Sequence, residues 1–266
     1  MSRSLAGKAA IAGIGQTEFS KASGRSELQL ACESVKSALD DAGLSPRDVD
    51  GMVTFTMDSS EECEVARNLG IPALRYFSRT TYGGGGSCAV VMHAAMAVAT
   101  GAADVVVCWR AFNERSGMRF GGAAMQGASM LPPFLDMYGP YGLLTPASWV
   151  AMQARRYMHE YGATNEHFGR IAVVDRRHAA TNPGAWFYQR PITMAEHQSS
   201  RWIVEPVLRL LDCCQESDGG VAVVVTTPER ARDLKQKPAV IRAAAQGAYD
   251  DGEMCTSYYR DDVAAL

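Results

Sequence analysis

The chain has 266 residues, of which 47% are hydrophobic and 21% are charged, and its formal net charge is -3. These values are typical of a globular protein with a large core, built as one large domain or two smaller ones. The sequence contains no basic run and no aromatic-studded Lys/Arg stretch, which argues against binding to nucleic acid or to an anionic membrane surface.

The N-terminal stretch MSRSLAGKAAIAGIG lacks the apolar run of a signal peptide, and no window approaches the roughly 18 apolar residues of a membrane helix. We therefore expect a cytoplasmic protein without a membrane span. Seven cysteines occur without CxxC or Cys/His ligand spacing. This pattern favours reduced thiols and predicts no disulfide and no metal site.

The first part of the chain alternates predicted strands and helices, beginning with the apolar run AAIAGIG. Ser26 can cap the first helix and Gly43 can end it. The elements that follow are a strand at 51–56, a helix at 61–70, a strand at 74–77, a helix at about 87–99 and a strand at 103–112. This alternation predicts an α/β fold with helices layered on a largely buried sheet.

Periodicity is lost over residues 113–145, where Gly, Met, Phe, Tyr and Pro dominate. Two interpretations fit this segment: a long surface loop, or a pliable apolar lid over a greasy ligand. Two helices are predicted next, the first with Val150, Ala154, Tyr157 and Tyr161 on one face. The α/β pattern then resumes in DCCQESDGGVAVVVTT, PERARDL and AVIRAAAQG.

The stretch TYGGGGSC, residues 81–88, is the main candidate for a binding site. A helix N-terminus offers unpaired N–H groups and a partial positive charge, and glycines let an acyl oxygen or thioester approach closely. Cys88 could be a nucleophile if a base were near, or simply a buried thiol. His93 is a poor base for it, because five helical positions leave the two side chains about 140° apart, and we expect it to contact a neighbouring element.

Other chemical candidates have plainer explanations. The Gly13-x-Gly15 pair lacks the third glycine and the following helix of a dinucleotide-binding motif. Asp212, Glu216 and Asp218 could supply acid or base chemistry, although a polar turn before a strand explains them as well. The vicinal pair Cys213-Cys214 is predicted to be structural.

The order of AAIAGIGQTEFSK, the glycine-rich turn into HAAMAVATGAADVVVCW, and DGGVAVVVTTPERARDL resembles the thiolase superfamily, in particular its lipid-transfer-protein or sterol-carrier-type branch. FNERSGMRF, RRYMHEYGAT, EHQSSRWIVEPVLRLLDCCQESDGG and SYYR are similar to the actinobacterial steroid side-chain aldolases of that branch. The resemblance runs the length of this chain and covers the first two-thirds of a family member.

The resemblance also gives a register for the thiolase nucleophile. In thiolases that cysteine lies seventeen residues before the glycine of a Gly-x-Ala-Asp-type turn, which is Gly101 here, so its position falls on Gly84. Cys88 falls where thiolases carry a leucine that faces inward. A chain without the nucleophile cannot form an acyl-enzyme, whereas a retro-aldol cleavage needs only a base for the hydroxyl proton and an oxyanion site for the enolate.

The resemblance implies a thiolase-like layered αβαβα fold whose first half is complete and whose second half is truncated. Residues 1–112 and 200–236 would form the N-terminal core, 113–199 a cap, and 237–266 the start of the second half. The implied reaction splits a 17-hydroxy steroid-CoA thioester into a 17-ketosteroid and propionyl-CoA. It uses no cofactor, and coenzyme A enters only as part of the substrate.

Two alternatives remain open: an acyl-CoA acyltransferase that uses Cys88, and a non-catalytic lipid or acyl-CoA-binding protein. The aldolase base and acid, thought to be tyrosines, would lie beyond Leu266, so no catalytic residue is assigned. A homodimer and a small OB-fold partner protein are also implied. The candidates for the substrate pocket are Tyr82, Gly83, Gly84, Gly85, Gly86, Ser87, Cys88 and Asn113.

Overall fold

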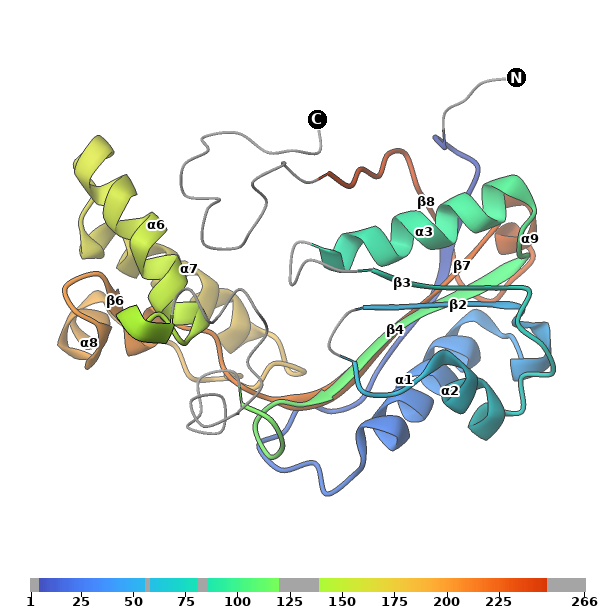
Figure 1. Ribbon diagram of the computed structural model, residues 1–266, viewed down its shortest axis with the longest axis horizontal. Helices are drawn as coiled ribbons and strands as arrows, with labels where there is room; N and C mark the ends of the chain where they lie inside the picture. The colour runs from blue at the N-terminus through green and yellow to red at the C-terminus, as the bar shows by residue number, and fades with distance from the viewer. Residues whose placement is uncertain (1–4, 56–57, 81–85, 120–138, 248–266) are drawn as a thin grey trace. The chain divides into compact units, whose positions relative to one another are not determined.

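The computed structural model describes residues 5–55, 58–80, 86–119 and 139–247, which form two compact units (Figure 1). Unit 1 contains the described residues up to Asn113 together with 217–247, and unit 2 contains the described residues of 114–216. None of the helices in this part of the chain combines the length and the apolarity needed to cross a bilayer.

Unit 1 is built on a six-stranded sheet with the strand order β3-β2-β4-β7-β1-β8. The strands are β1 (Ala10–Gln16), β2 (Gly51–Phe55), β3 (Tyr76–Thr80), β4 (Val105–Asn113), β7 (Asp218–Thr226) and β8 (Ala239–Val240). β2 lies parallel to β3 and β4, whereas β7 is antiparallel to both β4 and β1. The first four strands therefore point the same way, and the carboxyl ends of β2, β3 and β4 lie at one edge.

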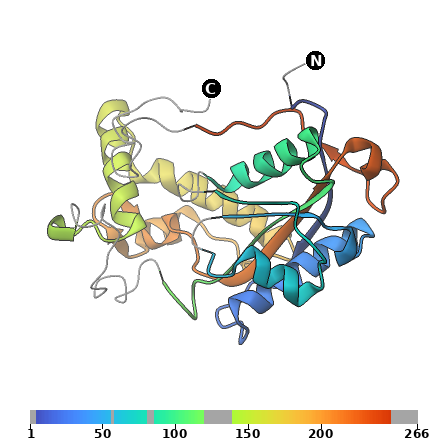
Figure 2. The ribbon, with the colours of Figure 1, turned by 45° about the vertical axis from the view of Figure 1, so that its right-hand side comes forward.

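Helices cover both faces of this sheet (Figures 1 and 2). They are α1 (Glu27–Ala42), α2 (Glu62–Leu69), α3 (Ser87–Thr100) and the short α9 (Pro228–Arg232). Alternate residues of β4 divide between the two faces: Val105 and Val107 pack with α1 and α2, while Val106 and Cys108 pack with α3. The result is the layered α/β arrangement that the sequence predicts.

Helix α1 begins and ends at the predicted residues. The Ser26 hydroxyl accepts a hydrogen bond from the Gln29 backbone N–H at 3.1 Å, and Gly43 ends the helix in the left-handed conformation at φ 76°. Between α1 and β2 lies the 3-10 helix η1 (Pro46–Asp48), with Pro46 at its first position. The edge strand β3 starts two residues later than its sequence pattern indicates.

Unit 2 is mainly helical. Its elements are η3 (Gly139–Tyr141), α6 (Pro146–Tyr161), α7 (Asn165–Thr181), α8 (Met194–Ser199), the paired strands β5 (Trp202–Val204) and β6 (Leu208–Arg209), and η4 (Leu210–Asp212). A small apolar cluster of Ala151, Val207 and Leu208, with Phe168 against it, holds these elements together. Residues 200–216, expected in the core domain, group with unit 2 because β5 packs on α6 and η4 packs on α7.

The apolar face predicted for α6 is largely solvent-exposed. Val150, Tyr157 and Tyr161 are 51%, 51% and 64% exposed, and the two tyrosine rings stack on each other with centroids 4.9 Å apart. Trp149 and Ala151 are buried instead. The helix therefore packs through Trp149 and Ala151, whereas the sequence pattern had pointed to Val150, Tyr157 and Tyr161.

Candidate functional site

The glycine-rich stretch TYGGGGSC, residues 81–88, ends in the first residues of α3. Tyr82, Gly83, Gly84 and Gly85 lie outside the residues that the structure describes. Gly86 is buried at the N-cap position of α3, and the buried Thr80 hydroxyl donates a 3.2 Å hydrogen bond to its carbonyl oxygen. In the described part of the chain, no side chain caps this helix.

Ser87 and Cys88 follow on the first turn of α3, and both side chains are exposed. The inward orientation expected for Cys88 is therefore wrong, because the buried face of α3 passes through Ala89, Ala94 and Ala95. The next cysteine along the chain behaves differently: Cys108 is buried and burial raises the pKa of its thiol, so it stays protonated.

His93 contacts a neighbouring strand, as the sequence predicts. Its Nδ1 lies 2.8 Å from the Ser78 hydroxyl of β3, and its Nε2 lies 2.9 Å from the Gln246 side-chain oxygen. Both ring nitrogens are thus engaged on the side of the helix away from Cys88, which leaves His93 without a role as its base.

Arg110 is a cationic residue that the sequence analysis missed, and it lies on the face of the sheet that α3 covers. Side chains two residues apart in a strand share a face, so Arg110 of β4 lies on the same face as Val106 and Cys108, which pack with α3. Its guanidinium carbon is 4.6 Å from the centroid of the Phe55 ring and 5.2 Å from that of Phe112. The available signal was its place as the charged residue of an otherwise apolar strand, VVVCWRAF.

Asp58 lies at the carboxyl end of β2 and is 4% exposed. Its carboxylate accepts hydrogen bonds from the backbone N–H groups of Ala111 (2.8 Å) and Ser60 (2.9 Å). Desolvation raises the pKa of this carboxyl group, against the lowering effect of the two N–H donors and of Arg110 and Arg79. The group joins β4 to the segment after β2 and shapes this edge of the sheet.

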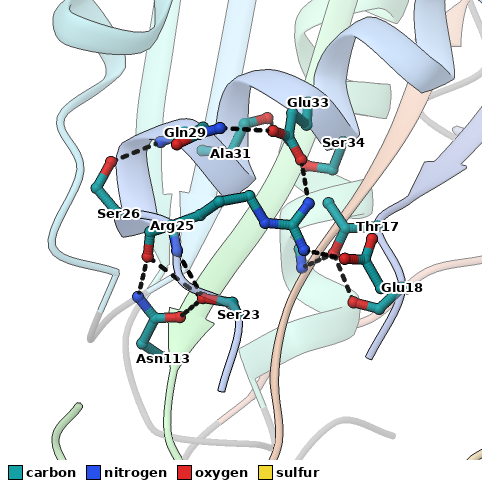
Figure 3. A network of polar contacts seen from close by, with 11 residues as sticks. Thr17, Glu18, Ser23, Arg25, Ser26, Gln29, Ala31, Glu33, Ser34 and Asn113 are labelled. Atoms are coloured by element: carbon teal, nitrogen blue, oxygen red, sulfur yellow. Dashed lines mark hydrogen bonds and ion pairs between the residues drawn. The ribbon is translucent and has the colours of Figure 1, made fainter. Parts of the chain in front are cut away.

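Asn113, the last pocket candidate, is held by the loop between β1 and α1 (Figure 3). Its side-chain oxygen accepts a 2.7 Å hydrogen bond from the Ser23 hydroxyl, and its side-chain amide donates one of 2.7 Å to the Arg25 carbonyl oxygen. Its backbone N–H donates to a Glu27 carboxylate oxygen at 3.0 Å. Asn113 is therefore bonded to this loop and to the start of α1, in addition to its pairing with Asp218 of β7.

The acidic candidates of the turn before β7 are each paired. The Asp212 carboxylate lies 2.6 Å from Nε2 of the fully buried His197, and Glu216 accepts a 2.7 Å hydrogen bond from Arg119. Asp218 is fully buried and accepts from the Ser23 backbone N–H at 3.0 Å. These contacts fit the interpretation of the three carboxylates as structural groups. No cluster of three or more His, Cys, Asp or Glu side chains that could hold a metal ion occurs within the described ranges.

Comparison with known proteins identifies the family. No protein-family model matches the chain. The chain is 65% identical over 266 residues to the steroid side-chain-cleaving aldolase of Thermomonospora curvata, covering 98% of this chain and 68% of that protein. The chain belongs to the thiolase-like steroid side-chain-cleaving aldolases. A second such aldolase, the 17-hydroxy-3-oxo-4-pregnene-20-carboxyl-CoA lyase of Mycobacterium tuberculosis, is 61% identical over 269 residues, 98% of this chain and 68% of that protein.

Solved structures agree with the assignment to these aldolases. A structure described as the Ltp2-ChsH2(DUF35) aldolase matches with a TM-score of 0.89 and 66% identity, over 97% of this chain and 66% of that chain. Human mitochondrial 3-ketoacyl-CoA thiolase matches with a TM-score of 0.63 at 15% identity, over 87% of this chain and 69% of that chain, which shows the shared thiolase fold. The predicted family and fold are confirmed, and the chain spans about two thirds of the length of its aldolase relatives.

Proposed function

We propose that this chain supplies the N-terminal core of an aldol-lyase that cleaves a 17-hydroxy steroid-CoA thioester into a 17-ketosteroid and propionyl-CoA. The observation that carries the proposal is the 61% identity to the 17-hydroxy-3-oxo-4-pregnene-20-carboxyl-CoA lyase over 98% of the chain. Glycine at position 84, where the resemblance places the thiolase cysteine, supports a reaction without an acyl-enzyme.

The reaction balances without an oxidant or a reductant. A base takes the proton of the hydroxyl on ring carbon 17, the bond from that carbon to the side chain breaks, and its electron pair passes into the thioester as an enolate. Protonation of the enolate carbon gives propionyl-CoA. Coenzyme A is part of the substrate, and no further cofactor is needed.

We propose that this chain contributes the oxyanion side of the chemistry. The N-terminal N–H groups of α3, whose N-cap residue Gly86 leaves it without a side-chain cap among the described residues, would stabilise the enolate oxygen. The positive charge of Arg110, on the α3-facing side of β4, would add to the field at this edge. The base and acid are expected in the part of the family that aligns beyond position 266.

The test uses the full-length natural protein with its partner and the hydroxylated steroid-CoA thioester, with products measured by mass spectrometry. We expect equal amounts of 17-ketosteroid and propionyl-CoA. If a parallel preparation of the Mycobacterium tuberculosis lyase releases both and this protein releases neither, the proposal fails. Binding of the thioester without turnover would then favour a non-catalytic role.

Cys88→Ala separates the lyase from an acyltransferase. The lyase mechanism leaves no acyl group on the enzyme, so the variant should keep its activity and intact mass should show no adduct on either protein. An acyl adduct that disappears in Cys88→Ala would show that the exposed thiol is a nucleophile after all.

The remaining partners are also proposals. The matching solved structure is described as an aldolase with a DUF35 component, which supports a partner protein for this chain. We propose that this partner is a small OB-fold protein. We further propose a homodimer in the cytoplasm, where CoA thioesters are made and consumed. Light scattering of the full-length protein with and without the partner would measure both associations.

A further inference from the structure

Unit 2 contains a buried network of polar side chains that plays no part in the proposed reaction. It joins four elements and consists of Asn165 of α7, His197 and Gln198 of α8, Arg209 of β6 and Asp212 of η4. His197 is fully buried, and the side chain of Asp212 is 5% exposed. The protonation state of this ring therefore depends on its hydrogen-bond partners rather than on water.

Arg209 sets the direction of the hydrogen bonds in the network, because a guanidinium group can only donate. Its Nε donates to the Asn165 side-chain oxygen at 2.9 Å. The Asn165 side-chain nitrogen therefore lies on the other side, where it donates to the Val207 carbonyl oxygen at 2.9 Å and to the Asp212 carboxylate at 3.1 Å. The oxygen and the nitrogen of this amide are thus distinguished by their partners.

The same Asn165 oxygen orients Gln198, and Gln198 in turn fixes the ring of His197. The Gln198 side-chain nitrogen donates to the Asn165 oxygen at 3.2 Å and to the His197 Nδ1 at 3.1 Å. Because an amide nitrogen donates, Nδ1 accepts and carries no proton. The proton of the neutral ring is therefore on Nε2, which donates to the Asp212 carboxylate at 2.6 Å.

The backbone of α7 closes the space beside Nδ1. A Cβ atom added at Gly169 would lie 2.7 Å from this nitrogen and 2.8 Å from the sulfur of Met194. A second ring proton, placed on Nδ1, would therefore point at the Gln198 side-chain nitrogen, which is itself a donor. A buried N–H group without an acceptor is unfavourable, so the folded unit favours the neutral ring.

The charges of the network are balanced while His197 is neutral. The positive charge of Arg209 offsets the negative charge of Asp212, whose carboxylate also accepts from the Arg209 backbone N–H at 2.7 Å. With the bonds from His197 and Asn165, this carboxylate has three donors and stays ionised. A second proton on the ring would add a buried positive charge that this pair does not offset.

The other groups around the network favour the same state. Cys213 follows Asp212, and burial raises the pKa of its thiol, so that it stays neutral. The charge of Arg201, which acts on this thiol, is positive. α7 contributes Asn165 and Gly169, and neither of these residues titrates. None of these described groups would stabilise a charged His197.

We propose that His197 makes unit 2 sensitive to acid. The folded unit holds the ring in the neutral form with its proton on Nε2, whereas in the unfolded chain the ring gains a second proton below about pH 6.5. Because the unfolded chain then binds one more proton than the folded unit, the stability of unit 2 is greatest above this pH and falls as the pH is lowered through it. The inference rests on contacts within unit 2 and is independent of the proposed reaction.

Hydrogen exchange of the full-length natural protein tests this inference, with protection factors corrected for the intrinsic effect of pH on exchange. We compare α7 (Asn165–Thr181) of unit 2 with α1 (Glu27–Ala42) of unit 1. From about pH 7.5 to about pH 5.5, protection of α7 should fall about 10-fold more than protection of α1, which is the factor by which protonation of a free imidazole favours the open form. Equal changes in the two helices would overturn the inference.

Three variants show whether His197 is the group that titrates. His197→Gln has no ring to protonate, and Gln198→Glu gives a proton on Nδ1 a carboxylate acceptor, so the additional loss of protection should disappear in both. His178→Gln removes an exposed histidine from α7 and should keep the loss. A loss that persists in His197→Gln contradicts the inference. If that variant does not fold, persistence of the loss in Gln198→Glu has the same consequence.

The position of the ring proton can also be observed directly. Long-range proton–nitrogen correlation spectra of protein labelled at histidine should show, for His197 at about pH 7.5, a proton on Nε2 and none on Nδ1. The signals of His197 are those that are absent from His197→Gln or change in Gln198→Glu. A proton on Nδ1 at this pH would be incompatible with the hydrogen-bond directions set by Arg209, and the inference would fail.

Discussion

The single hydrogen atom at Gly15 allows α1 to lie directly against β1. A methyl group at this position would overlap the carbonyl oxygen of Ser34 and the backbone nitrogen of Ala38. Gly13 stands against Ala38 in the same way. The Gly13-x-Gly15 pair therefore serves helix–strand packing, which gives a physical reason for the failure of the dinucleotide reading.

Gly15→Ala should destabilise unit 1, because backbone atoms of α1 would have to move away from the sheet. We expect the free energy of unfolding to fall by about 1–3 kcal/mol, measured by urea denaturation followed by circular dichroism. Gly184→Ala is the matched control: the nearest atom to its added methyl is 3.5 Å away, so the change should stay within about 0.5 kcal/mol. Equal stabilities for the two variants would contradict this account.

Residues whose roles depend on local chain geometry were predictable, and those that depend on distant partners were not. The Ser26 cap and the Gly43 stop can be read from neighbouring positions alone. The contacts of Arg110 with Phe55 and of Asp58 with Ala111 join strands that are far apart in the sequence and meet only in the folded sheet. The role of Asn113 in the substrate pocket stays a prediction, and its bonds to Ser23 and Arg25 cross about ninety positions of sequence, beyond any local pattern.

Helix α1 is the element on which the loop around Arg25 depends. It is amphipathic, with Leu30, Val35 and Leu39 buried against the sheet. Its first turn also carries Glu27, which bonds to the end of β4, and its second turn carries Glu33, which pairs with Arg25. The start of α1 thus joins the apolar core to the polar edge of the sheet.

Ser26→Ala removes the side-chain cap of α1 and should cost about 1 kcal/mol of stability, seen as a lower Tm. The physical reason is that the Gln29 N–H loses the acceptor that it has at 3.1 Å. Ser26→Asp keeps an acceptor at the same place and should retain the wild-type Tm. A Tm for Ser26→Ala equal to that of Ser26→Asp would show that the cap contributes nothing.

Elements of unit 1 were predicted more closely than the surfaces of unit 2. α3 and β4 carry dense apolar patterns with clear ends, and their observed bounds lie within two residues of the prediction. The edge strand β3 has a neighbour on one side only, which weakens its pattern. In α6, apolar side chains occur around much of the helix, and packing against β5 rather than periodicity selected the buried ones.

The stability of the molecule should depend on pH through carboxylates that are ionised more easily when folded. In η1, the Ser45 backbone N–H and hydroxyl donate to the Asp48 carboxylate at 2.9 and 2.8 Å, and Arg230 of α9 lies 3.2 Å away. These contacts lower the pKa of Asp48, the backbone hydrogen bond first. A lowered pKa adds stability above the ordinary value of 3.8, and this stability is lost as the pH falls through the folded value.

Asp48→Asn should therefore be less stable than the wild type at neutral pH, with the difference shrinking on acidification. Urea midpoints measured from about pH 7 to about pH 3 would show the two curves converging. Asp233→Asn, next to the end of α9, controls for the loss of one negative charge and should leave the wild-type curve shape. Curves for Asp48→Asn and the wild type that stay parallel at every pH would contradict the assignment.

The pairing of Asn113 with Asp218 has a consequence for the history of the fold. Antiparallel partners at the end of a ladder lie close enough to be joined by a two-residue turn, so β4 and β7 would form an ordinary hairpin if the intervening residues were absent. Insertions, deletions or a complete exchange of that segment leave the register of the central sheet unchanged. Residues 114–216 can thus change in length or sequence as one segment, while the strands and helices of unit 1 stay as they are.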